Sequence, residues 1–388
     1  MPQTRSSILS LDRWFGLLLP LLAVLAGLTV GGIILLALGT DPIAAYSAMF
    51  GGAFGNKNGL ADVLVVATPL LLVALGVIIS FRANVINIGG EGQLIMAALA
   101  TTWLAIQLGE ALPGWLVILL SLPAGAIAGG LWGAIAGWLK ARLNVNEILS
   151  TIMLNQIAIQ LGYFLLRGVM LDPAERAAGT NIPHSARLPR STDLARFADI
   201  GKALGLQPSK EAGIGGYWGD LYGLLADPTR LHTGLLLAIA MAVVVYIFLW
   251  RTTIGYRIRA VGLNPHAARY AGIDVQRYMA FSMGLSGALI GLAGAVEILG
   301  LHHRMFEPTS VSAGYGFSGI VVALFGKLHP LAAIPSAILF GGLLVGGDKM
   351  QREMQIPQVL VTAILGVIVL FVVSSDIWVR RRANKRVS

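Results

Sequence analysis

The chain has 388 residues, of which 56% are apolar and only 12% are charged, and its formal net charge is +9. Soluble domains carry about 25% charged residues, so this composition excludes an ordinary soluble protein. The positive charge lies beside long apolar runs, which argues against a nucleic-acid-binding surface. The absence of cysteine excludes disulfides and thiolate metal sites.

Apolar runs that approach the roughly 20 residues needed to cross a bilayer recur along the chain. We predict an all-α polytopic membrane protein with about ten transmembrane helices and an inverted repeat, forming a single transmembrane domain over residues 1–388. The expected spans are residues 14–39, 61–80, 87–108, 115–138, 149–167, 231–250, 279–299, 312–328, 330–347 and 357–376. The first run is too long for the apolar core of a signal peptide and is interpreted as a span.

Basic residues in short loops predict which side of the bundle faces the cytoplasm. One side collects Arg5, Arg13, Arg82, Lys140, Arg142, Lys327, the five arginines of residues 251–278 and the basic tail 377–388. The short loops of the opposite side hold only Lys57, Arg304, Lys349 and Arg352. Both termini and the loop 251–278 are therefore expected in the cytoplasm.

Residues 168–230 form the one long extracytoplasmic segment of this topology. Their seven basic and seven acidic residues cancel, so the segment does not bear on orientation. Its glycine, proline and aromatic content predicts a partly ordered cap. Two interpretations stay open, a contact surface for an extracytoplasmic partner and a tolerated insertion.

Residues 251–278 form a basic island between two apolar runs. Asn264 can cap a short helix that begins at Pro265, a residue suited to the first helical position. Apolar residues recur there at the three-to-four spacing of an amphipathic helix, namely Leu263, Ala267, Tyr270 and Ala271. The helix is either a docking surface for a soluble partner or part of a loop that only fixes orientation.

Two internal alignments indicate a repeat. Residues 145–155 (VNEILSTIMLN) align without gaps with residues 356–366 (IPQVLVTAILG), and residues 89–99 (GGEGQLIMAAL) align less well with residues 314–324 (GYGFSGIVVAL). Each pair joins predicted spans that are five apart, so the paired spans run in opposite directions. This pattern is typical of inverted repeats, which place a substrate route near the bilayer midplane.

The segment Arg82–Gln93 is the most polar stretch that leads into a predicted span. Gly89, Gly90 and Gly92 weaken the helix there, and broken helices at membrane depth are tolerated where they line a cavity. The candidate pathway residues are Asn87, Glu91, Gln93, Asn155, Tyr315, Phe317 and Ser318. Structural roles are the alternative: Glu91 can stabilise a helix N-terminus, Asn155 can join helices, and the aromatic side chains can anchor at the interface.

Several chemical signatures are absent from the sequence. It contains no GxxxxGK[ST] phosphate loop, no HExxH motif, no GxSxG motif and no thiol nucleophile. We therefore expect no catalytic residue, no enzyme activity and no cofactor bound by this chain. Glu297, His302 and His303 lack further spaced ligands, so no metal site is expected either.

Four segments carry a resemblance that spans most of the chain. RAVGLNPHAARYAGIDV (residues 259–275) strongly resembles the cytoplasmic coupling segment of bacterial ABC importer permeases in the branched-chain amino acid, ribose and nucleoside group. Three further segments resemble the simple-sugar and nucleoside branch of this group. They are residues 81–93 (FRANVINIGGEGQ), 144–155 (NVNEILSTIMLN) and 314–330 (GYGFSGIVVALFGKLHP). The chain departs from this pattern at Gly90 and in the length of residues 168–230.

This resemblance implies a set of partners. An ATP-binding subunit, commonly with two fused domains, would bind ATP-Mg and dock on a coupling element formed by Gly262, Asn264, Pro265, Ala267, Ala268, Tyr270, Ala271 and Gly272. A second permease subunit, identical or similar, would complete the pore. An extracytoplasmic solute-binding lipoprotein would deliver the solute, and the chain would lie in lipid of the inner or plasma membrane.

The expected function is that of the transmembrane subunit of an ATP-driven ABC importer for nucleosides, which works by alternating access. A simple sugar is the alternative solute. An ion-coupled secondary transporter is the rival class, but the sequence lacks the chain of acidic and histidine residues that a proton relay needs. A membrane scaffold without transport is a further alternative, which the intramembrane Glu91 and the apparent repeat disfavour.

Overall fold

A computed structural model describes residues 22–180, 182–213, 215–357, 359–364, 366–368, 370, 371 and 374. Within these residues the chain is helical, with no β-strand beyond one isolated bridge between Arg196 and His232. The tail 377–388 and residues 14–21 of the first predicted span lie outside the described part.

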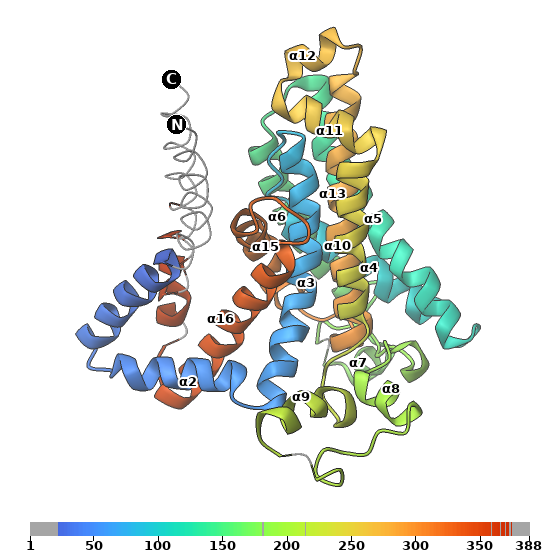
Figure 1. The fold of residues 1–388 in the computed structure, drawn as a ribbon. Coiled ribbons are helices and arrows are strands. Elements are labelled where there is room, and N and C mark those ends of the chain that lie inside the picture. The colour runs from blue at the N-terminus through green and yellow to red at the C-terminus, as the bar shows by residue number, and fades with distance from the viewer. Residues whose placement is uncertain are drawn as a thin grey trace, which may run out of the picture. The chain divides into compact units, whose positions relative to one another are not determined.

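The main helices are shown in Figure 1. They are α2 (Pro42–Phe54), α3 (Lys57–Arg82), α4 (Gly90–Leu108), α5 (Gly114–Leu143), α6 (Glu147–Arg167), α10 (Gly234–Arg251), α11 (Thr253–Leu263), α12 (Pro265–Tyr270), α13 (Val275–Glu297), α15 (Tyr315–Phe325) and α16 (Ala333–Met354). Shorter elements are α7 (Pro173–Ala178), the 3₁₀ turn η1 (Arg190–Thr192), α8 (Phe197–Ala203), α9 (Gly216–Ala226), the π-helix η2 (Ile298–His302) and α14 (Pro308–Ser312).

Six helical segments of the described chain are long and apolar enough to cross a membrane. They are α3, α5, α6, α10, α13 with η2, and α14 with α15. These segments confirm a multi-pass membrane protein. Each of the ten predicted ranges overlaps a described helix, the remaining four being Leu22–Ala37, α4, α16 and Val359–Ile368.

Three differences from the predicted ranges bear on the site. The span expected from residue 87 begins only at Gly90, because the side chain of Asn87 accepts the N–H of Gly89 and forms a turn. The span 312–328 is interrupted at Ala313 and Gly314, which have φ angles of +45° and +75°, and its helix ends at Phe325. The loop 251–278 is largely helical, since α11 precedes the predicted helix α12 and α13 begins at Val275.

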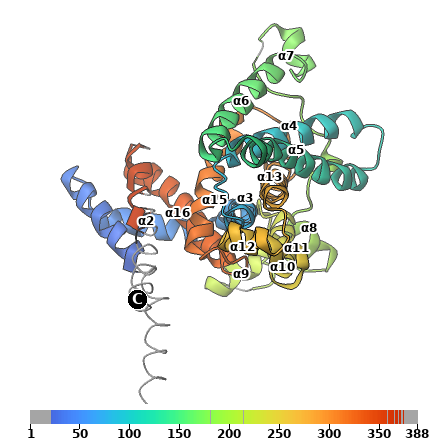
Figure 2. The same ribbon diagram turned by 90° about the horizontal axis from the view of Figure 1, so that it is seen from above.

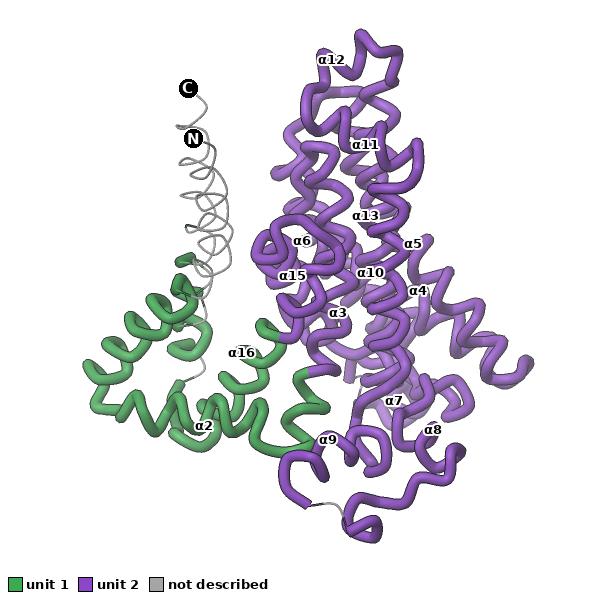
Figure 3. Tube along the Cα trace, in the orientation of Figure 1, with its two compact units in different colours: residues 1–63, 339–388 green, residues 64–338 purple. Residues whose placement is uncertain are grey.

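The chain divides into two compact units (Figure 3). Unit 1 comprises residues 1–63 and 339–388, and unit 2 comprises residues 64–338. In unit 1, α2 begins at the cap Asp41 and was not among the predicted helices. Gly346 packs so closely on α2 that a Cβ there would lie 2.5 Å from the carbonyl oxygen of Met49.

The core of unit 2 is built from α3, α4, α5 and α13. Figure 2 shows α4, α5 and α13 side by side. A Cβ on Gly129 of α5 would lie 2.5 Å from the carbonyl oxygen of Gly287 and 2.6 Å from the Cα of Gly291, both on α13. Such close backbone approach is how small residues join helices in lipid, where burial of apolar surface gives little driving force.

Candidate functional site

A buried amide cluster precedes α4. Asn87 and Gln93 form a reciprocal pair, with Nδ2 of Asn87 donating to Oε1 of Gln93 and Nε2 of Gln93 donating to Oδ1 of Asn87, both at 3.1 Å. Nδ2 of Asn87 also donates to Oγ of Ser286 on α13 at 2.8 Å. These side chains are almost fully buried. A buried polar network of this kind holds a defined geometry because each lost bond would leave a desolvated group.

Asn155 of α6 fixes the start of α4. Its Oδ1 accepts the N–H of Gly92 at 2.8 Å, and its Nδ2 donates to the carbonyl of Ile88 at 3.0 Å. The first N–H groups of a helix have no intrahelical partner, so Asn155 satisfies one that would otherwise be orphaned. The structure therefore brings three of the predicted pathway residues, Asn87, Gln93 and Asn155, to one helix N-terminus.

Glu91 joins this N-terminus to that of α15. Its Oε1 accepts the N–H groups of Gly316 at 2.7 Å and of Phe317 at 3.3 Å, and its carboxyl also hydrogen-bonds Ser312. The break at Ala313 and Gly314 frees the N-terminus of α15 to receive this side chain. An anionic acceptor at a helix N-terminus is stabilised both by the free N–H groups and by the helix dipole.

The glycines at this junction allow close contact. A Cβ on Gly90 would lie 2.8 Å from the Cα of Gly316, and a Cβ on Gly316 would lie 2.3 Å from the backbone nitrogen of Glu91. We expected Gly90 and Gly92 to loosen the helix, but α4 includes both of them without interruption. Their function in the fold is to let two helix N-termini and α6 approach.

The remaining predicted pathway residues differ in exposure. Tyr315 is buried, Ser318 is half-buried and Phe317 is 51% exposed. Sequence reasoning missed two residues of the junction, Ser286 and Trp132. The indole Nε1 of Trp132 is buried without a hydrogen-bond partner among the described residues, 3.0 Å from where a Cβ on Gly92 would lie. A polar side chain inside an apolar span is the signal that would have drawn attention to Ser286.

The segment 251–278 contains α12 as the sequence predicts. Oδ1 of Asn264 accepts the N–H groups of His266 at 3.0 Å and Ala267 at 3.1 Å, which confirms the predicted cap. Gly272 has a φ of +77° and closes the helix, while the N–H of Ile273 reaches back to the carbonyl of Ala268 at 3.0 Å.

One face of this segment is apolar and exposed. Leu263 and Tyr270 are 88% and 95% exposed, and Ala267 and Ala271 are exposed beside them. We refer to these four residues as the outer face of α12. Ala268 was predicted with them but is buried against Val261 and Val275. The apolar periodicity had included Ala267 without Ala268, and only the resemblance had added Ala268 to the coupling element.

Two arginines of this end of unit 2 lie against Trp250. The guanidinium groups of Arg82 and Arg259 lie 5.2 Å and 5.5 Å from the centre of its ring, and Arg82 also donates to the carbonyl of Leu328 at 2.8 Å. Gly262 packs on the end of α3, where a Cβ would lie 2.0 Å from the carbonyl oxygen of Arg82. The loops predicted on one side of the membrane thus meet at one end of the long helices.

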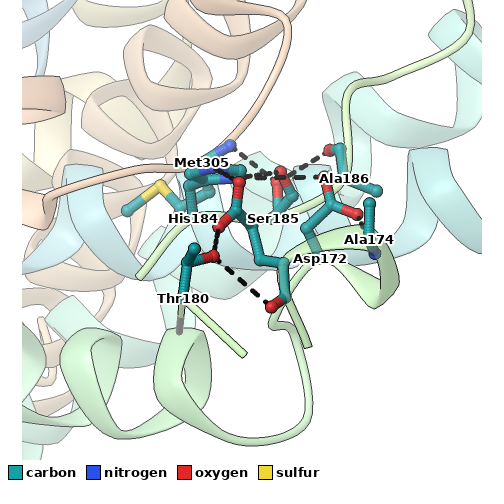
Figure 4. A network of polar contacts seen from close by, with 8 residues as sticks. Asp172, Ala174, Thr180, His184, Ser185, Ala186 and Met305 are labelled. Carbon is teal, nitrogen blue, oxygen red and sulfur yellow. Dashed lines mark hydrogen bonds and ion pairs between the residues drawn. The ribbon is translucent and has the colours of Figure 1, made fainter. Parts of the chain in front are cut away.

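The end of unit 2 opposite to Trp250 is covered by residues 184–197, which we call the strap. Backbone bonds of 2.8 Å join Ser185 to Met305, Leu188 to His303 and Leu194 to Leu299. Figure 4 shows this contact at Ser185, whose Oγ also accepts the N–H of Met305 at 3.0 Å, together with His184 and Asp172. His303 Nδ1 lies 2.9 Å from Oδ1 of Asp193. The predicted cap is therefore ordered along this stretch.

His232 lies under the strap, two residues before α10. Its Nδ1 accepts the N–H of Gly234 at 3.2 Å, and its ring packs on Gly300. Burial, followed by the positive charge of His303 and Arg196, lowers the pKa of His232 to about 4. The residue is therefore neutral in the folded protein at neutral pH.

We expect His232 to make the protein sensitive to acid. An unfolded histidine has a pKa of about 6.5, so between that pH and about 4 the unfolded chain binds more protons than the folded chain. The stability that the neutral ring contributes is complete above pH 6.5 and is lost as the pH falls toward 4, by about 3 kcal/mol in total. When the pH is lowered from 7.5 to 4.5, the melting temperature of the detergent-solubilised protein should fall less steeply for His232→Asn than for the natural protein.

The matched control for this prediction is His266→Asn, which alters an exposed histidine on α12. It should retain the pH dependence of the natural protein. Identical slopes for the natural protein and His232→Asn would show that the charging of His232 does not govern acid sensitivity.

No group of three potential metal ligands occurs among the described residues. Glu297 and His302 approach to 3.4 Å and form a pair at the end of α13.

Comparison with known proteins decides the family. Residues 59–373 match the family described as the permease component of the branched-chain amino acid transport system. The chain belongs to this family. As an ABC transporter permease it is a membrane subunit and not an enzyme.

Three relatives show how far the similarity of this permease extends. It is 36% identical to the glucose ABC transporter permease protein TsgB13 of Haloferax volcanii, over 97% of this chain and 92% of the relative. It is 35% identical to the guanosine ABC transporter permease protein NupP of Bacillus subtilis, over 92% and 93%. It is 32% identical to the nucleoside ABC transporter permease protein NupB of Lactococcus lactis, over 92% and 90%. No solved structure matches the permease.

Proposed function

We propose that the chain is the transmembrane subunit of an ATP-driven ABC importer that moves nucleosides across the inner or plasma membrane. The observation that carries this proposal is the similarity, over nine-tenths of the chain, to permeases named for guanosine and nucleosides. A simple sugar is the second candidate, because a glucose permease is 36% identical. Family membership argues against an ion-coupled secondary transporter.

The outer face of α12 supports docking of an ATP-binding partner. Four exposed apolar side chains on an ordered, basic segment have no role in the fold of this chain. The segment also contacts α13 through the cluster of Val261, Ala268 and Val275. We infer that the partner, which binds ATP-Mg, docks here and moves α12, and that the segment and both termini lie in the cytoplasm.

The junction of α4 and α15 supports an inverted repeat. Gly89 and Gly314, which occupy the same position of the internal alignment, are the N-caps of these two helices. The helix starts meet at Gly90, Glu91 and Gly316. We propose ten spans in a single permease domain, with the solute crossing beside this junction. The unpartnered Nε1 of Trp132 is a donor that a polar solute or water would satisfy.

A second permease subunit is the proposed partner within the membrane. Two permeases of Bacillus subtilis are named for guanosine, and this chain is 35% identical to one and 29% identical to the other. Lactococcus lactis likewise has two permeases named for nucleosides, at 32% and 29% identity. This pairing favours a heterodimer over a homodimer. An extracytoplasmic solute-binding lipoprotein completes the proposed importer.

The solute can be tested by uptake in cells of the source organism with the chain deleted or restored. Labelled guanosine and labelled glucose are supplied separately, each with and without an excess of the other, unlabelled compound. We expect guanosine uptake to require the chain and to resist competition by glucose. Chain-dependent glucose uptake that guanosine does not compete with would instead establish the sugar, and loss of neither uptake would reject both solutes.

A further inference from the structure

The helix α9 carries an exposed apolar arc that its position in the fold does not explain. Tyr217, Trp218, Leu221 and Leu225 are 62%, 73%, 43% and 42% exposed. At 3.6 residues per turn these four side chains fall within an arc of about 100°. The opposite side of the helix faces inward, with Gly219, Gly223 and Ala226 buried, and Leu224 is buried at one edge of the arc.

The apolar side chains of the membrane spans are exposed because those helices cross the bilayer, but α9 is too short to cross it. With 11 residues, α9 is about 16 Å long, whereas the hydrocarbon core of a bilayer is about 30 Å thick. Figure 1 shows α9 at the end of the long helices of unit 2, running across them rather than along them. A helix in this position lies beside a bilayer and does not cross it.

The orientation of α9 is fixed by its neighbours. The hydroxyl of Tyr222 donates to the carbonyl of Gln207 at 2.9 Å, and the N–H of Ser209 donates to Oδ1 of Asp227 at 2.9 Å. The helix packs so closely on α8 that a Cβ on Gly201 would lie 2.0 Å from the carbonyl oxygen of Leu225. These contacts hold the apolar arc away from the protein.

The chain also holds α9 near the membrane boundary. The linker of residues 227–233 joins it directly to the span α10. The N–H of Phe197 donates to the carbonyl of Leu231 at 3.0 Å, and that of Thr233 donates to the carbonyl of Ala195 at 2.9 Å. The start of α10 and the strap are thereby fixed together, so α9 stays at the level where the spans leave the bilayer.

We propose that α9 is an interfacial helix that binds the lipid surface. Tyr217 and Trp218 would lie at the headgroup level, where aromatic side chains with a polar atom concentrate, and Leu221 and Leu225 would reach the acyl boundary. The occupant is lipid because an ordered, non-spanning helix at the bilayer boundary exposes only apolar and aromatic side chains on one arc. The proposal holds for either orientation of the chain and for any solute.

The absence of cysteine allows a direct test with the full-length protein. Leu221→Cys places a label on the apolar arc, and Asp220→Cys places one outside it on the same helix. Each variant is labelled with nitrobenzoxadiazole and reconstituted into phosphatidylcholine vesicles that contain either plain lipid or lipid with a nitroxide on acyl carbon 5. Leu225→Cys repeats the measurement at a second position of the arc if Leu221→Cys does not reconstitute.

We expect the label at Leu221 to emit at shorter wavelength than the label at Asp220. Quenching by the lipid nitroxide should be at least about twofold stronger at Leu221, and quenching by aqueous iodide correspondingly weaker, because an interfacial helix buries its apolar face at the boundary between headgroups and acyl chains. Equal quenching at the two positions would overturn the proposal. Shielding of Leu221 from both quenchers would also overturn it, because a second copy of the chain would then cover the arc.

Discussion

The variant Glu91→Ala is expected to lose at least about tenfold in solute uptake and to unfold at a lower temperature than the natural protein. Glu91 holds the start of α15 against the start of α4 through the N–H groups of Gly316 and Phe317. A hydrogen bond contributes about 0.5–1.5 kcal/mol to stability, and removal of the carboxyl leaves two buried N–H groups without their acceptor, which costs about 1–3 kcal/mol each. The broken helix would then no longer be held in one position.

Glu91→Gln distinguishes a positioning role from direct contact with solute. Glutamine keeps the acceptor oxygen, so it should restore most of the melting temperature and an intermediate rate of uptake. Glu110→Gln, in the exposed turn after α4, is the control and should change neither property. Should Glu91→Ala keep a natural melting temperature and natural uptake kinetics, the carboxyl neither positions α15 nor belongs to the pathway.

Ala267→Arg is expected to abolish ATP-dependent uptake while leaving the chain folded in the membrane. Ala267 lies in the middle of the outer face of α12, where arginine would hold an ATP-binding partner away. A bulky charged side chain at the centre of an apolar interface should cost at least as much as the loss of a hot-spot residue, about 2 kcal/mol or more, which corresponds to roughly thirtyfold in affinity. Uptake and co-purification of the ATP-binding subunit should therefore fall together.

The control variant His266→Arg adds the same charge one residue away, on a side of α12 outside the outer face. It should retain uptake. Ala268→Arg tests the buried face, and because that side chain packs on Val261 and Val275 it should lower the yield of folded protein instead. Normal uptake and co-purification with Ala267→Arg would rule out docking on this face.

Local features of the fold could be predicted because they depend on neighbouring residues. Each span consists of an apolar run of the required length, and the cap of α12 depends on Asn264 and Pro265 alone. The helix α11 was missed because its arginines made the segment read as a polar loop. Periodicity could not show which of Ala267 and Ala268 faces inward, since that depends on Val261 and Val275.

The candidate site was predicted by residue type and not by contact. Asn87 and Gln93 were chosen as polar groups near a glycine-rich helix start and Asn155 as an amide inside a span, and all three meet at that helix start. Their partners could not be predicted, because Ser286 lies 199 residues from Asn87 and Gly316 lies 225 residues from Glu91. The strap could not be predicted either, because its contacts with residues 299–305 are made by backbone groups, which any sequence supplies.

The helix formed by α13 and η2 touches both ends of unit 2. Val275, its first residue, packs on Ala268 of α12, and its last turns accept hydrogen bonds from the strap. Its 28 residues span about 42 Å. We therefore expect this helix to move as a rigid body, so that a displacement of α12 at one end also displaces the strap at the other end.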